Sequence, residues 1–84
     1  MARKRETTEP ESFEDLVNSL APGKSWSDVA TLTHTSARTL WRLRHGRLER
    51  PTRVVMHNIS AGLRCTTRRV EAAVRVTREA VLAS

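Results

Sequence analysis

The chain has 84 residues, a formal net charge of +6 and a single cysteine, Cys65. This length suggests one small domain, and one cysteine excludes an internal disulfide or a CxxC metal site. No apolar run approaches the ~20 residues that span a bilayer, and no signal-peptide core follows the basic N-terminus, so we expect a cytoplasmic protein that does not bind membranes.

The first residues differ in composition from the rest. Residues 1–10 are polar, contain three basic side chains and end at Pro10, which predicts a flexible basic arm before a domain at residues 11–84. Apolar side chains then recur at helical spacing from Phe13 to Leu20, and Pro22-Gly23 ends this first helix.

Two short helices are expected next. Ser25 is a candidate N-cap for a helix from Trp26 to Leu32, whose apolar residues are Val29, Ala30 and Leu32. Ser36 or Thr35 then caps a third helix that runs to about His45 and stops at Gly46. Leu40 and Leu43 are its expected core side chains.

The C-terminal half predicts two further helices. After a loop at residues 47–51, Pro51 and Thr52 open a fourth helix with an apolar stripe of Val55, Met56, Ile59 and Leu63. Thr66 or Thr67 caps a fifth helix, in which one face carries Val70, Ala73, Val74, Thr77 and Val81. No strand pattern competes, so the predicted fold class is all-α, a bundle of five helices.

Positive charge is concentrated in the middle of the chain. Residues 36–53 hold six arginines and one acid, Glu49. An arginine bias of the genome would also produce such a composition, but the clustering indicates a polyanionic partner, with nucleic acid ahead of an anionic membrane.

Residues 25–46 follow the pattern of a helix-turn-helix, in which a small residue, Ala30, faces Leu40 and Leu43 of the second helix. This segment resembles the Cro/repressor-type (XRE-like) family of phage and bacterial regulators. The matching positions are Ser25 to Ala30, Thr35-Ser36, Leu40, Leu43, Gly46, Pro51, Ile59-Ser60, Leu63, Cys65-Thr66 and Val70. The departures are Trp26 for Gln, Thr33 in an apolar position, His34 for the turn Gly, Arg44 for Glu, and Arg64 for a small turn residue.

The resemblance implies a lambda-repressor-like bundle whose second helix reads DNA in the major groove. The residues that would face base edges are Ala37, Arg38, Trp41 and Arg42. The expected phosphate contacts are Trp26, Ser36, Thr39, Arg47, Arg50 and Arg53. The stripe of Val74, Thr77 and Val81 on the fifth helix is the candidate dimer surface.

The sequence therefore predicts a transcriptional regulator, most simply a repressor, that binds double-stranded DNA as a homodimer. We expect no metal, no cofactor, no small-molecule ligand and no catalytic site, because the three histidines lie on separate elements and the hydroxyls cluster at helix caps. Two alternatives stay open. One is a protein-interaction module, such as an antitoxin or adaptor, and the other is a nonspecific nucleic-acid-binding protein.

Overall fold

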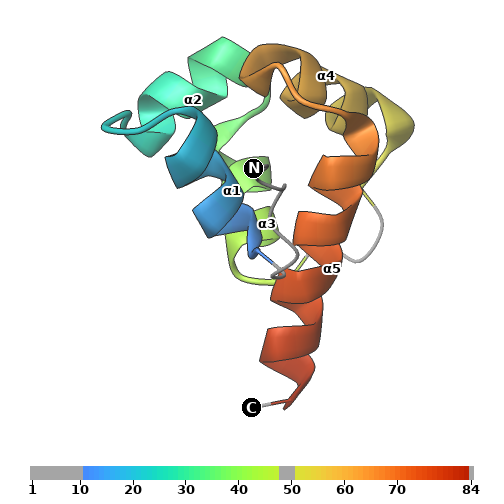
Figure 1. Ribbon diagram of the computed structural model, residues 1–84. Helices are drawn as coiled ribbons and strands as arrows, with labels where there is room; N and C mark the ends of the chain where they lie inside the picture. The colour runs from blue at the N-terminus through green and yellow to red at the C-terminus, as the bar shows by residue number, and fades with distance from the viewer. Residues whose placement is uncertain (1–10, 48–50, 84) are drawn as a thin grey trace, which may run out of the picture.

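The computed structural model describes residues 11–47 and 51–83, and over these residues it contains five α-helices and no strand. The helices are α1 (Phe13–Leu20), α2 (Trp26–Thr33), α3 (Ala37–Arg44), α4 (Arg53–Leu63) and α5 (Thr67–Ala83). The predicted all-α class and order of elements are confirmed. Figure 1 shows the C-terminal part of α5 extending beyond the other four helices.

Hydroxyl side chains cap the N-termini of the helices, as the sequence indicates. The Ser25 hydroxyl accepts a hydrogen bond from the backbone N–H of Asp28 at 3.1 Å, and Ser36 does the same for Thr39 at 3.1 Å. Thr52 caps α4 and Thr66 caps α5 in the same way. Each cap satisfies one of the backbone donors that a helix N-terminus leaves without a partner.

The core lies where the helical spacing places it. Each helix contributes apolar side chains to it, and the largest of the fully buried ones are Phe13, Leu16, Val17, Val29, Leu40, Leu43, Ile59 and Val70. Cys65 is partly buried and packs against this core. Burial raises the pKa of the Cys65 thiol, which is therefore protonated at neutral pH.

One position in α2 differs from the expectation. Leu32 is 43% exposed, whereas its neighbour Thr33 is fully buried and donates its hydroxyl to the carbonyl of Val29 at 2.7 Å. The reason lies in α4. A Cβ at Gly62 would come within 2.7 Å of Thr33 Cα, so α4 approaches the backbone of α2 closely at this point. Thr33, whose side chain is small and hydrogen-bonded, therefore occupies the buried position next to α4.

Candidate nucleic-acid interface

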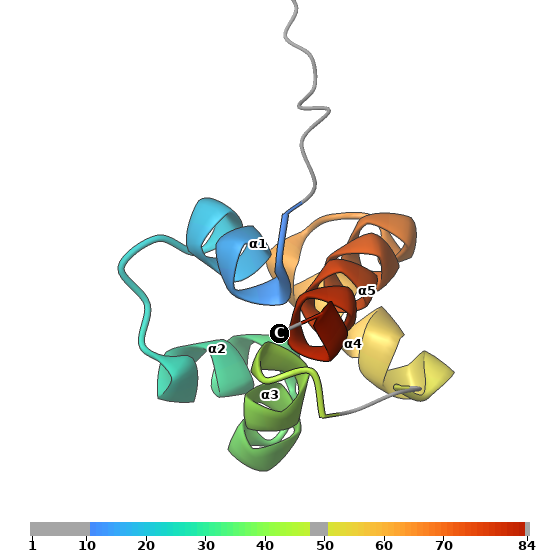
Figure 2. The same cartoon turned by 90° about the horizontal axis from the view of Figure 1, so that it is seen from below.

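Hydrogen bonds within the chain stabilise the turn between α2 and α3. His34 ends α2 in the left-handed conformation, with φ 52°, and the backbone N–H of Thr35 then donates to the carbonyl of Ala30 at 3.1 Å. The Thr35 hydroxyl is buried and donates to the carbonyl of Thr33 at 3.0 Å. Figure 2 shows α2 and α3 running in different directions on either side of this turn. The turn and its bonds determine the direction in which α3 leaves α2.

Leu40 and Leu43 attach α3 to the core, and each is 1% exposed. The opposite side of α3 is exposed at all four positions predicted to face base edges, Ala37, Arg38, Trp41 and Arg42. Arg38, Trp41 and Arg42, together with Arg47 beyond the helix, line one shallow depression. The structure therefore brings three arginines and a tryptophan together on one outward face, which we call the α3 face.

Trp41 is held in a defined position on this face. Its ring is stacked on that of His45, with the ring centroids 4.1 Å apart and the planes inclined by 23°. The His45 ring is in turn fixed by a hydrogen bond between its Nδ1 and the carbonyl of Trp41, at 2.8 Å. Sequence reasoning missed this contact of His45, although the spacing of four residues on one helix could have indicated it.

Arg44 does not belong to the α3 face. Its guanidinium lies 4.1 Å from the ring centroid of Trp26, and its Nε is buried with no hydrogen-bond partner among the described residues. Trp26 is half-buried and also stacks on Phe13, with centroids 6.3 Å apart. The structure thus places Trp26, a predicted phosphate contact, between two packing partners, where it connects the start of α2 to the end of α3.

The other predicted phosphate contacts lie in different surroundings. The Ser36 hydroxyl caps α3 and donates to Thr39 Oγ1 at 2.9 Å, so these two hydroxyls already pair with each other. Arg47 is exposed and belongs to the α3 face. Arg53 is exposed at the start of α4 but lines a separate depression with other side chains of α4 and α5. Arg50 lies outside the described residues.

The predicted dimer stripe is divided between the interior and the surface, and here the prediction requires correction. Val74 is 5% exposed, and Thr77 is also buried, where its hydroxyl accepts a hydrogen bond from the backbone N–H of Phe13 at 2.8 Å. Both side chains pack within the chain's own core because α1 lies across this part of α5. Val81 is 44% exposed, and a Cβ at Gly46 would lie 2.8 Å from its Cγ2. Val81 therefore also packs against the turn after α3.

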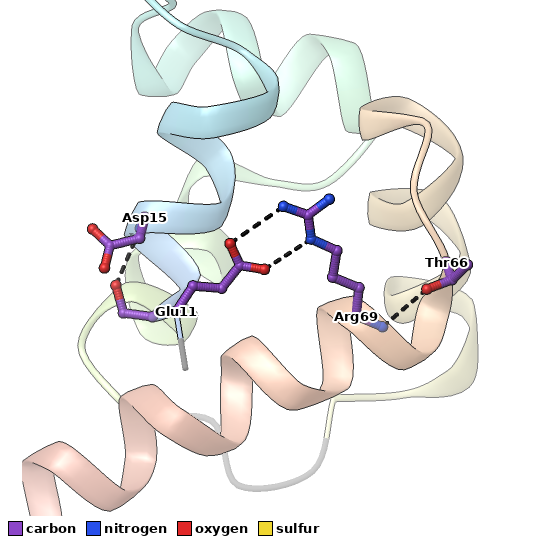
Figure 3. A network of polar contacts seen from close by, with 5 residues as sticks. Glu11, Asp15, Thr66 and Arg69 are labelled. Atoms are coloured by element: carbon purple, nitrogen blue, oxygen red, sulfur yellow. Dashed lines mark hydrogen bonds and ion pairs between the residues drawn. The ribbon is translucent and has the colours of Figure 1, made fainter. Parts of the chain in front are cut away.

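A second link between α1 and α5 was not anticipated. Arg69 donates to both carboxylate oxygens of Glu11, from Nε at 2.8 Å and from Nη2 at 3.3 Å (Figure 3). The hydrogen bond to Glu11 raises the pKa of the Arg69 guanidinium. The pair is 58 residues apart in sequence, and no local pattern indicates it.

Among the described residues, no group of three His, Cys, Asp or Glu side chains is placed to hold a metal ion. None of the helices in that part of the chain is long and apolar enough to cross a membrane. Comparison with protein-family models, with curated proteins and with solved structures finds no match.

Proposed function

We propose that the chain is a sequence-specific double-stranded DNA-binding protein, most simply a Cro-type transcriptional repressor. In this proposal α2 and α3 form a helix-turn-helix within a lambda-repressor-like bundle, and α3 enters the major groove. The observation that supports it is the α3 face. Its three arginines surround an exposed tryptophan, and α3 contains no acidic residue.

An α-helix such as α3 fits the major groove of duplex DNA. An α-helix with its side chains is about 10–12 Å wide, and the major groove is about 12 Å wide. Arg38 and Arg42 are one helical turn apart and both exposed. Two guanidinium groups at this spacing suit guanine O6 and N7, the commonest specific contact of arginine in the groove.

A single α3 covers one half-site, so the proposal includes two copies on an operator. The end of α5 is the part of the described surface that supports such pairing, because Val81 and Leu82 are both exposed there and Leu82 is 72% exposed. The proposed dimer contact therefore lies nearer the C-terminal end of α5 than the stripe of Val74, Thr77 and Val81 that the sequence predicted.

The test begins with selection of bound sites from random duplex DNA. Arg38→Ala and Arg42→Ala should each cost roughly 1–3 kcal/mol on the selected site and relax specificity at one or two base pairs. Arg75→Ala, an exposed arginine of α5, is the matched control and should change little.

The same experiment separates the alternatives. Equal losses on selected and scrambled DNA would contradict base reading by these arginines. A wild-type protein that bound both DNAs equally would be a nonspecific binder. One that bound neither at low salt would contradict the proposal and leave an acidic protein as the partner of the α3 face.

A further inference from the structure

Trp41 differs in chemistry from the three arginines of the α3 face. It is 48% exposed, although tryptophan is usually buried, and it lies among Arg38, Arg42 and Arg47. Guanidinium groups can donate hydrogen bonds to phosphates and to guanine edges. A large apolar ring among them is poorly suited to either contact. An apolar group of the DNA is the partner that its surface suits.

The ring is also ordered before any partner arrives. The His45 ring stacks on Trp41, and a 2.8 Å hydrogen bond to the backbone carbonyl of Trp41 keeps the His45 ring in place for this stack. A side chain that is already fixed loses little conformational entropy on binding, so its contacts contribute more fully to affinity.

Along the major-groove edges of the four bases, the C5-methyl group of thymine is the apolar feature. Resting on the proposed duplex binding by α3, we infer that Trp41 is a specificity-determining residue that reads a thymine methyl group. Arg38 precedes Trp41 by three positions and Arg42 follows it directly, so the thymine lies next to the bases that the arginines contact. The half-site therefore combines guanine with an adjacent thymine.

A base stacked on Trp41 from single-stranded DNA is the competing outcome, because aromatic side chains in basic grooves bind unpaired bases. The geometry favours the methyl group. His45 already stacks on the Trp41 ring, and Arg38 and Arg42 flank Trp41 on one α-helix, an element that the major groove admits.

The experiment replaces thymines of the selected duplex, one at a time, by deoxyuridine, which lacks the methyl group alone. Wild-type protein should lose about fourfold in affinity at one or two positions, the change that corresponds to one apolar carbon leaving a contact. Trp41→Ala should bind more weakly and bind the thymine and uracil duplexes equally. Val54→Ala, which shortens an exposed apolar side chain of α4, should keep the wild-type difference.

The controls keep the outcomes distinct. Helical circular dichroism and the fluorescence of Trp26 report whether Trp41→Ala is folded. If Arg38→Ala and Arg42→Ala weaken duplex binding but uracil changes nothing in the wild type, the proposed function stands and the reading of the methyl group is wrong. If Trp41→Ala still binds the thymine duplex more tightly than the uracil duplex, the inference is wrong and another residue, such as Ala37, contacts the methyl group. A Trp41→Ala defect confined to single-stranded DNA would favour stacking, and absence of duplex binding would overturn both proposals.

Discussion

His34 shows how a single residue sets the start of the α3 face. Its φ of 52° lies in the left-handed region, where the Cβ of an L-residue crowds the backbone at a cost of about 1–2 kcal/mol. Arg64 ends α4 in the same conformation, with φ 60°. Glycine adopts this conformation without steric cost, but at positions 34 and 64 the chain turns with a residue that has a Cβ.

We expect glycine at position 34 to stabilise the fold relative to alanine. His34→Gly relieves the crowding, whereas His34→Ala keeps the Cβ and the strain, so the glycine variant should be about 0.5–1 kcal/mol more stable than the alanine variant. Urea unfolding followed by circular dichroism measures this difference. Equal midpoints for the two variants would show that the turn does not hold position 34 in the left-handed region.

Helices α1 and α5 are joined by polar contacts as well as by their apolar faces. The backbone N–H of Phe13 at the start of α1 donates to the buried hydroxyl of Thr77 in α5, and that hydroxyl donates to the carbonyl of Ala73 at 3.0 Å. The Glu11–Arg69 pair lies at the same end of α1. Thr77 thus satisfies a buried helix donor of α1 from another helix.

Replacing Thr77 by valine tests this link. The shape is kept, but the N–H of Phe13 loses its acceptor in a buried place, so Thr77→Val should cost about 1–3 kcal/mol. Thr33→Val is the matched control, since Thr33 is also buried but its hydroxyl donates to the carbonyl of Val29 in its own helix and, among the described residues, accepts no bond from another helix. The control should be close to neutral in chemical denaturation. Similar losses in both variants would show that the hydrogen bond from Phe13 adds nothing to the bond that each threonine hydroxyl makes within its own helix.

At the scale of the whole molecule, the described arginines of residues 36–53 have different surroundings. Some pack against other side chains of the fold, and others are exposed to solvent. The Arg44 guanidinium lies over the ring of Trp26, whereas Arg47 is exposed on the α3 face. A cation that neutralises a phosphate releases a counterion, so its contribution appears in the salt dependence of binding.

For Arg47→Ala, we expect weaker binding to selected and scrambled duplexes alike. The slope of log affinity against log salt concentration should become shallower by about 0.9 for the lost phosphate contact. Arg75→Ala should leave the slope at its wild-type value. An unchanged slope in Arg47→Ala would remove Arg47 from the phosphate contacts.

Pairing of two copies is a property of the whole molecule. Leu82 is more exposed than any other described large apolar side chain, at 72%. A charge there should oppose burial against a second copy, so Leu82→Asp should lower both self-association in sedimentation and affinity for a two-half-site operator. Val54→Asp on α4 should alter neither. A wild-type protein that sediments as a monomer at high micromolar concentration without DNA would contradict a standing dimer through this end of α5.

The helices, their caps and most of the core were predictable because each depends on residues within about one or two turns of one another. A cap joins positions three residues apart, as in Ser36 and Thr39, and the inward face of α3 follows from the spacing of Leu40 and Leu43. The exposure of the base-facing positions follows from the same spacing, since they lie opposite the two leucines.

Contacts between distant segments depended on how the helices pack together. Periodicity marks an apolar face of α2 but does not choose between Leu32 and Thr33. That choice depends on Gly62, where α4 comes so close that a Cβ would lie 2.6 Å from the Leu32 carbonyl oxygen. Likewise Thr77 belongs to an apolar stripe in the sequence, but it is the position of α1 across α5 that buries it and gives its hydroxyl a partner.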